Sequence, residues 1–203
     1  MTREKRSSQM KQRADLQERT RQRIVESTVK LHGTVGPART SISAVADHAG
    51  VRRSTVYRHF PDEASLFAAC TAHWTAGNQP PRLDLWAAIA DPDERLATAL
   101  GELYAYYRST EQMMVNLLRD EETMPIVKQL FTGFRDYLTA AAATLSAGRH
   151  ARGPARRRVG AAIGHALAFT TWRSLTHDLG LDDSEAVDLM RRLVSAAALT
   201  DKR

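Results

Sequence analysis

The sequence predicts an all-α protein of about nine helices. Apolar residues recur at three- and four-residue spacing through most of the chain, whereas the alternation typical of strands is scarce. Glycine and proline fall mainly between these periodic segments, as at Gly50, Pro61 and Gly148, where they favour turns. The 203 residues allow one large or two small domains, and a hydrophobic content of 43% is ample for a buried core.

Residues 40–66 carry the most distinctive local pattern, two short helices joined by a tight turn. Ser41 precedes the first helix, where its hydroxyl can accept a hydrogen bond from a free backbone amide. Gly50 stands where left-handed backbone is needed to end that helix, and Val51 pins the turn to the core. The predicted buried face of this helix consists of Val45, Ala46 and Ala49.

The second helix of this unit begins near Ser54 and leaves its polar residues free. Val56 and Phe60 lie four residues apart and give it a buried face, while Pro61 ends it and Asp62 can cap the helix that follows. Arginine can bond guanine in bidentate fashion, a threonine methyl can contact thymine, and tyrosine or histidine can reach phosphates. The residues left over for such contacts are Arg53, Thr55, Tyr57, Arg58 and His59.

This order of residues resembles the N-terminal signature of the tetracycline-repressor (TetR-like) family of transcriptional regulators. The resemblance covers roughly Arg23 to Leu66 and includes the capped helix, the Gly-Val turn, the hydroxyl-hydrophobe-Tyr segment and the His-Phe pair. It implies a three-helix helix-turn-helix domain followed by a C-terminal helical bundle that dimerises. Glu63 departs from the pattern, because the family often has a phosphate-binding lysine there. Carried over by position, the DNA contacts are Ser41, Ser43, Arg52, Arg53, Ser54, Thr55, Tyr57, Arg58 and His59.

The distribution of charge independently favours a nucleic-acid partner. Residues 1–60 hold 13 Lys plus Arg against 5 Asp plus Glu, whereas residues 61–203 hold 16 against 18. Release of counterions makes such a basic segment bind phosphate in a salt-dependent way. A solvated basic surface without a partner is the alternative. The N-terminal residues that could reach a groove or a backbone are Arg3, Lys5, Arg6, Lys11 and Arg13.

We divide the chain into a basic tail at residues 1–20, a helix-turn-helix DNA-binding domain at 21–68, and a ligand-binding and dimerisation domain at 69–203. The tail is either disordered or extends a first helix that is predicted from about Leu16 to Leu31. A loop over Gly77–Pro81 and a short turn with Trp86 follow the fourth helix, and Asp91-Pro92 opens the next one. The remaining helices are predicted over 92–107, 113–118, 125–145, 154–177 and 184–198.

The last two predicted helices carry a strip of small and apolar residues. Gly160, Gly164 and Ala168 lie four apart, which lets another helix approach closely. The resemblance implies that these helices pair with their copies in a symmetric dimer, and the alternative is that both faces are intrachain core. Two reading heads roughly 34 to 36 Å apart would match a palindromic operator. The predicted interface residues are Gly160, Ile163, Gly164, Leu167, Ala168, Val187, Met190 and Val194.

The middle of the chain is where a small organic effector is expected to bind. Aromatic, methionine and amide side chains from several helices are typical of a bundle cavity, although such stripes also occur in ordinary cores. An effector that prefers one spacing of the reading heads would shift the population away from DNA. The candidate ligand residues are Trp86, Tyr104, Tyr107, Met113, Met114, Asn116, Leu117, Phe131, Phe134 and Trp172.

Several function classes are disfavoured. The first 20 residues are polar and no run of about 18 apolar residues occurs, so we expect a cytoplasmic protein without a membrane anchor. Cys70 is the only cysteine and falls on an apolar face, and its pairing with His73, like that of His165 with His177, lacks the spacing of a catalytic or metal site. No phosphate loop or serine elbow is present, so we expect no enzyme, metal or cofactor.

These features favour a homodimeric transcriptional regulator, most simply a repressor released from a palindromic operator by a small organic ligand. A ligand-independent or architectural DNA-binding dimer is the alternative. A third hypothesis is a helical module whose basic end binds acidic partners or membranes. The sequence leaves open the effector, the operator, the regulated genes and the choice between repression and activation.

Overall fold

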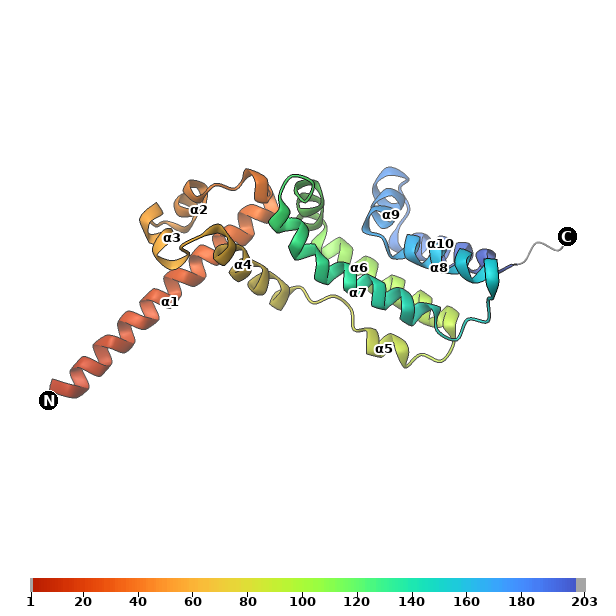
Figure 1. Cartoon of the computed structure of the whole chain (residues 1–203), viewed down its shortest axis with the longest axis horizontal. Coiled ribbons are helices and arrows are strands. Elements are labelled where there is room, and N and C mark those ends of the chain that lie inside the picture. Colours follow the sequence, from red (N-terminus) through yellow and green to blue (C-terminus); the bar gives the residue numbers. More distant parts are fainter. Residues whose placement is uncertain (1, 200–203) are drawn as a thin grey trace. The chain divides into compact units, whose positions relative to one another are not determined.

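The computed structural model describes residues 2–199, with side chains from Ser7 onward, and every regular element in that range is a helix (Figure 1). The predicted all-α class is therefore confirmed. The helices are α1 Thr2–Thr34, η1 Pro37–Arg39, α2 Ile42–Ala49, α3 Arg53–His59, α4 Glu63–Gly77, α5 Leu83–Ala87, α6 Pro92–Asp120, α7 Pro125–Ser146, α8 Gly153–Leu167, α9 Phe169–Arg173, the π-helical η2 Ser174–Asp178, and α10 Asp183–Ala198.

The chain packs as two units. The first contains the residues up to Gln79 together with Gln112–Leu130, and the second contains Pro80–Glu111 and the residues from Phe131 onward. Helix α6 therefore contributes to both units. The predicted division at residues 20 and 68 concerns function and stays a prediction.

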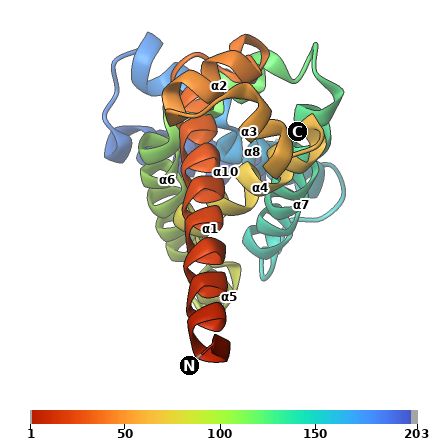
Figure 2. The same ribbon diagram turned by 90° about the vertical axis from the view of Figure 1, so that its left-hand side faces the viewer.

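In the first unit, α1 lies against α2, α3 and α4 (Figure 2). Their apolar faces form one cluster, in which Ile24 and Val56 are completely buried and Phe60 is 3% exposed. Cys70 is buried in the same cluster, where desolvation raises the pKa of its thiol to about 12. The expectation that Cys70 is a small core residue is confirmed.

The predicted helix ends of this unit are confirmed. The hydroxyl of Ser41 accepts a hydrogen bond from the amide of Ala44 at 3.1 Å. Gly50 is left-handed at φ 63° and ψ 41°, and the amide of Val51 donates to the carbonyl of Ala46 at 2.9 Å. The carboxylate of Asp62 caps α4 at 2.7 Å. These contacts fix where α2 begins and ends and where α4 begins.

In the second unit, α8 packs on α10 with the two helices antiparallel. Arg158, near the start of α8, donates to the carbonyls of Ala197 and Leu199 at the end of α10, at 3.3 and 2.7 Å. Asp91 caps α6 as predicted, because its carboxylate accepts from the amides of Asp93 and Glu94.

Two predicted helix boundaries were wrong. The expected break after residue 107 is absent, because residues 108–112 contain no glycine or proline and α6 continues to Asp120. Conversely, the predicted helix 154–177 is interrupted at Ala168, whose backbone is extended at φ −72° and ψ 132°. The hydroxyls of Tyr104 and Tyr107 donate to the carbonyls of Ala166 and Leu167 at 2.9 and 2.6 Å. The free carbonyl groups at the end of α8 thus accept hydrogen bonds from residues distant in sequence.

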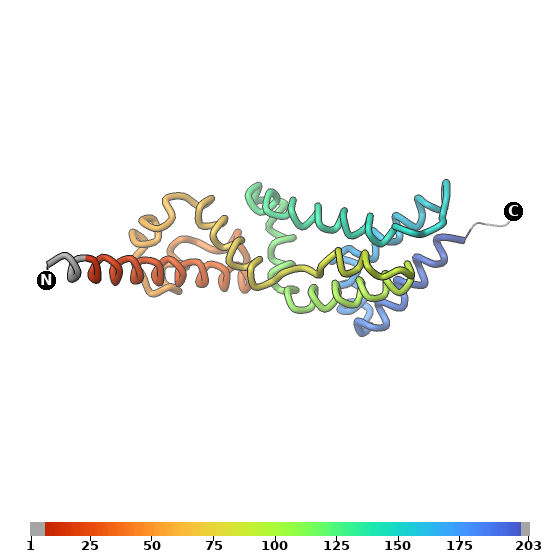
Figure 3. Tube along the Cα trace, turned by 90° about the horizontal axis from the view of Figure 1, so that it is seen from below, coloured from red at the N-terminus to blue at the C-terminus, as the bar shows by residue number. Residues whose placement is uncertain are grey.

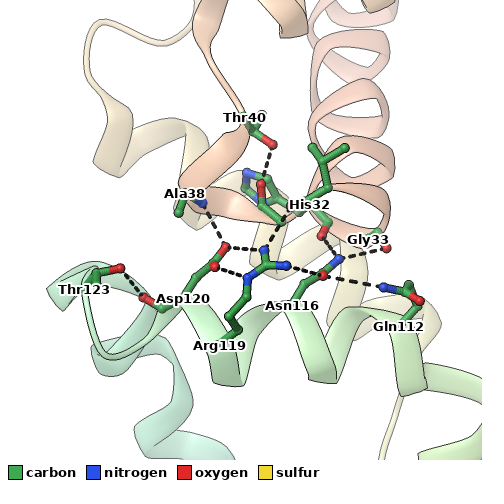
Figure 4. A network of polar contacts seen from close by, with 11 residues as sticks. His32, Gly33, Ala38, Thr40, Gln112, Asn116, Arg119, Asp120 and Thr123 are labelled. Carbon is green, nitrogen blue, oxygen red and sulfur yellow. Dashed lines mark hydrogen bonds and ion pairs between the residues drawn. The ribbon is translucent and has the colours of Figure 1, made fainter.

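A polar network in the first unit holds the segment between α1 and α2 (Figure 4). The buried amide of Asn116 donates to the carbonyls of His32 and Gly33 at 2.9 and 3.0 Å. Arg119 donates to the carbonyl of Val35 at 2.9 Å. The backbone amide of Ala38 donates to the carboxylate of Asp120 at 2.9 Å. The last two turns of α6 therefore fix the chain immediately before α2.

The network requires a glycine at position 36. Gly36 has φ 94°, a conformation that side chains with a Cβ rarely adopt. A Cβ there would also overlap the guanidinium of Arg119 and lie 2.6 Å from a carboxylate oxygen of Asp120. Gly36 thus lets the backbone pass directly over this ion pair.

Asp120 is the charged centre of the network. Burial alone would raise the pKa of its carboxyl, but hydrogen bonds from Arg119 and from the Ala38 amide, with the charge of Arg119, hold that pKa below its ordinary value. The stability that Asp120 contributes is therefore present above the unfolded pKa of about 3.9 and is lost as the pH falls through the lower folded pKa. At neutral pH the carboxylate is ionised and its contribution is complete.

We predict that Asp120→Ala lowers the free energy of unfolding by about 1–3 kcal/mol, because it leaves the Ala38 amide without an acceptor and Arg119 without its ion partner. Urea denaturation followed by circular dichroism measures the change, and amide exchange at Ala38 should accelerate. Asp47→Ala, at an exposed carboxylate of α2, is the control. Equal stability of the two variants would contradict the role of Asp120.

Replacing Gly36 and Gly101 by alanine should have opposite effects on stability. Gly36→Ala introduces a clash and strained backbone, so unfolding should become easier by about 1 kcal/mol or more. Gly101 lies inside α6 with nothing within 4 Å of a Cβ, so alanine there should stabilise by roughly 0.5–1 kcal/mol. Thermal unfolding of both variants checks the sign, and destabilisation by Gly101→Ala would show that our account of the open position is wrong.

Candidate nucleic-acid interface

Helix α3 presents a basic and hydroxyl-bearing face. Its anchors Val56 and Phe60 are buried, and no acidic residue occurs between Arg52 and Phe60. Tyr57 is 47% exposed although it is a large aromatic residue. The exposed polar side chains are Arg52, Arg53, Ser54, Tyr57 and Arg58. Such a face offers guanidinium and hydroxyl groups to a polyanion without a competing carboxylate on the same helix.

The other predicted DNA contacts are less accessible. Thr55, His59 and Ser43 are half-buried, and the hydroxyl oxygen of Ser41 is already occupied as the cap of α2, although its proton remains free to be donated. Burial lowers the pKa of His59, and the positive charges of Arg58 and Arg21 lower it further. Its Nε2 atom is buried without a hydrogen-bond partner. Without a nearby phosphate, His59 is therefore held toward its neutral form.

Arg21 of α1 is a residue next to α3 that sequence patterns did not single out. Its guanidinium carbon lies 5.1 Å from the centroid of the Phe60 ring, and it forms an ion pair with Glu18 at 3.7 Å. Arginine stacked on an aromatic ring keeps its charge available. Among the basic residues of the predicted tail, Lys11 and Arg13 are exposed, while the side chains of Arg3, Lys5 and Arg6 lie outside the described part.

The predicted effector residues do not form one set. Trp86, Tyr104, Tyr107, Phe131, Phe134 and Trp172 belong to the second unit, whereas Met113, Met114, Asn116 and Leu117 belong to the first. Asn116 has a structural role, because both of its amide hydrogens are used in the network around Gly36. The spacing of Asn116, Arg119 and Asp120 on one helix face was the signal that could have indicated this network.

The aromatic residues of the second unit pack closely on one another. Tyr107 lies 5.3 Å from Phe169, 5.8 Å from Trp172 and 6.4 Å from Phe134, measured between ring centroids. The indole of Trp86 donates to Glu102 at 2.8 Å and that of Trp172 to Asp183 at 2.9 Å. A cavity of about 420 Å³ lies elsewhere in this unit and is lined by Ser146, Ala147, Gly148, Arg149, Ala151, Arg156, Val159 and Gly160.

The eight predicted dimer residues lie at different depths. Ile163, Leu167, Met190 and Val194 are buried within the single chain, and Ala168 and Val187 are half-buried. Gly160 and Gly164 are exposed, and a Cβ at either would meet nothing within 4 Å. On the packed neighbour α10, Leu189 and Leu193 are 44% and 41% exposed. The exposed glycines thus lie on α8, and the exposed leucines lie on α10, which packs against it.

Within the described residues, no group of three or more His, Cys, Asp or Glu side chains could hold a metal ion. None of the helices described here is long and apolar enough to span a membrane.

Comparisons with known proteins agree with the geometry of α2 and α3. Residues 24–70 match the family model described as "Bacterial regulatory proteins, tetR family". No curated protein matches the chain.

Solved structures resemble most of the chain. A TetR-like transcriptional regulator from Rhodococcus sp. RHA1 superimposes with a TM-score of 0.63 at 17% identity, covering 87% of this chain and 93% of that one. A tetR-family transcriptional regulator from Streptomyces coelicolor gives 0.56 at 18%, covering 89% and 79%. A TetR transcription regulator from Haloarcula marismortui ATCC 43049 gives 0.55 at 17%, covering 89% and 97%.

These relatives are regulators and not enzymes, and the same is true of the family that residues 24–70 match. Residues 24–70 thus resemble the tetR family of bacterial regulatory proteins, and the chain has the fold of solved TetR-type transcriptional regulators along most of its length.

Proposed function

We propose that the protein is a homodimeric repressor that reads a palindromic operator with α3 and leaves it when a small organic ligand binds. The observation that carries this proposal is the outer face of α3, where Arg53, Tyr57 and Arg58 are exposed while Val56 is completely buried. A short helix anchored in this way can enter the major groove without disturbing the core.

The second part of the proposal is the dimer. The exposed glycines of α8 offer a smooth surface, and Leu189 and Leu193 on α10 offer protruding apolar side chains. In a two-fold dimer the same surface occurs on both copies, so the leucines of one copy can pack on the glycines of the other. Ile163, Leu167, Met190 and Val194 would then support this face from beneath.

The third part is the effector. We place its site among the aromatic residues of the second unit, where ring faces and phenol groups could hold an organic molecule. Helix α6 supplies Tyr104 and Tyr107 to that cluster and Asn116 and Asp120 to the network before α2. A ligand that displaces α6 would therefore act on the segment that precedes the reading unit.

Selection from a pool of random duplexes tests the whole proposal. A dimeric reader should enrich a palindrome whose half-sites are about 10 base pairs apart, since each copy reads one half-site. A ligand that raises the melting temperature should also weaken binding to that palindrome. Enrichment without symmetry would exclude the dimeric reader, and an effector-insensitive palindrome binder would favour a ligand-independent DNA-binding dimer.

Arg53→Ala and Arg58→Ala separate base reading from phosphate binding. If either arginine bonds guanine, its removal should cost about 1–3 kcal/mol at one base pair of the operator and relax specificity there. Equilibrium binding to operators substituted at each position measures this. A uniform loss across all sequences would indicate a phosphate contact, and unchanged binding by both variants would contradict the role of α3.

Gly164→Leu tests the dimer surface. Because a Cβ at position 164 meets nothing within the chain, leucine should leave the monomer folded and weaken only association. Sedimentation velocity should then show a shift toward monomer with an unchanged circular dichroism spectrum. Gly101→Leu, at the open position in α6, is the matched control. An unaltered sedimentation profile for Gly164→Leu would exclude this face.

A further inference from the structure

Residues 7–19 of α1 have no packing partner among the described residues. Residues 7–19 are all exposed, including Met10 at 71% and Leu16 at 62%. Figures 1 and 3 show these turns continuing past α3 with no other element of the same unit beside them. The match to the family model begins only at residue 24, so this stretch lies outside the helix-turn-helix core. Contacts with the core therefore do not explain why it is helical.

Local preference explains the helix. Residues 9–19 read QMKQRADLQER, in which all but the aspartate are good helix formers and no glycine, proline or β-branched residue interrupts the run. An isolated helix of this length is marginal in water, but here it continues a helix already fixed by packing at Ile24 and Val25. The packed C-terminal half of α1 nucleates the helix, and the exposed N-terminal half extends it by propagation.

The exposed half carries unpaired positive charge. Lys11, Arg13 and Arg19 form no ion pair within 4 Å among the described residues, whereas Arg21 is paired with Glu18. Residues 7–20 hold three Lys or Arg against two Asp or Glu, and Arg21 and Arg23 follow directly. Since Glu18 is paired with Arg21, Asp15 is the one carboxylate of this stretch outside an ion pair, and the stretch keeps a net positive charge.

This segment leaves the domain next to the end of α3. Arg21 lies over the ring of Phe60, and the charges of Arg21 and Glu18 act on His59. At about 1.5 Å per residue, Arg13 lies roughly 12 Å and Lys11 roughly 15 Å along the helix beyond Arg21. Those distances are well within one turn of duplex, about 34 Å.

We propose that residues 7–20 form a helical arm that binds the phosphate backbone of duplex DNA beside the groove entered by α3. The inference rests on the proposed function, because it needs α3 to lie against DNA. Charge complementarity identifies the partner: three unpaired cations on a preformed helix meet a chain of phosphates, and the contact carries no base specificity. The arm extends the footprint of each reading head and raises affinity for all sequences alike.

The test is the salt dependence of binding by the full chain. The variant Lys11→Gln, Arg13→Gln, Arg19→Gln keeps good helix formers while removing three charges. Binding to a fluorescein-labelled duplex of about 30 base pairs and arbitrary sequence is measured by anisotropy from about 20 to 200 mM NaCl, because phosphate contacts do not depend on sequence. The slope of log K against log salt should decrease in magnitude by about 2 to 3 for each bound protomer, hence by about twice that for a dimer, and affinity should fall most at low salt.

The variant Arg152→Gln, Arg156→Gln, Arg157→Gln removes the same charge from exposed positions at the start of α8 and is the matched control. It should keep the slope of the unmodified protein. Equal slopes for the unmodified protein and both variants would contradict the proposed arm but not DNA binding itself. Equal decreases of the slope in both variants would show that only net charge matters, and this too would contradict the arm. Failure of the unmodified protein to bind any duplex would overturn the arm together with the proposed function.

A second measurement does not depend on the substitutions. Amides of residues 7–20 should exchange rapidly in the free protein, because their helix is exposed on all sides, and should become protected when the duplex is added. Unchanged exchange of these amides, with protection appearing in α3, would contradict the arm and support the reading helix alone.

Discussion

The burial of Val56 and Phe60 is the constraint on which the helix-turn-helix formed by α2 and α3 depends. Helix α3 has only seven residues, too few to persist alone in water, so Val56 within it and Phe60 directly after it must be held by the surrounding apolar cluster. Once they are held, the orientation of the remaining residues follows from helical geometry, and Arg53, Tyr57 and Arg58 face outward. The outer surface of α3, which we propose contacts DNA, is thus oriented by two buried residues that are not part of that surface.

A second constraint fixes the segment that joins α1 to α2. The segment between α1 and α2 has little apolar surface to bury, and it is held instead by the polar residues of α6. Hydrogen bonds to charged groups are stronger than neutral ones, and bonds in a network strengthen one another, so removing one partner weakens its neighbours as well. The segment itself must have glycine at position 36, because any larger residue would displace the side chains of Arg119 and Asp120 on α6. Stability of the reading unit is therefore tied to a helix far from it in sequence.

Local chemistry was readable from the sequence, and long-range contacts were not. Caps at Ser41 and Asp62, the left-handed Gly50 and the buried Cys70 each depend on neighbours within a few residues, and all were predicted correctly. The break at Ala168 was missed because Tyr104 and Tyr107, some sixty residues away, accompany it by bonding the carbonyls before it. The hydrogen bonds of Asn116 to the carbonyls of His32 and Gly33 were missed for the same reason, because an amide on an apolar helix fits a pocket or a buried network equally well. The place of Asn116 in a ligand site stays a prediction.

The energies involved are of the size that regulation needs. Removing one buried partner from a charged hydrogen-bond network costs about 1–3 kcal/mol, which corresponds to a factor of roughly 5 to 150 in an equilibrium constant. An effector therefore need not unfold the reading unit, since weakening the contacts of Asn116 or Asp120 would change the population competent for DNA by that factor. The phosphate contacts that we propose for α3 and the arm would add affinity without altering this factor, because they would act only on the competent state. In this account affinity and control reside in different parts of the first unit, and they can be varied independently.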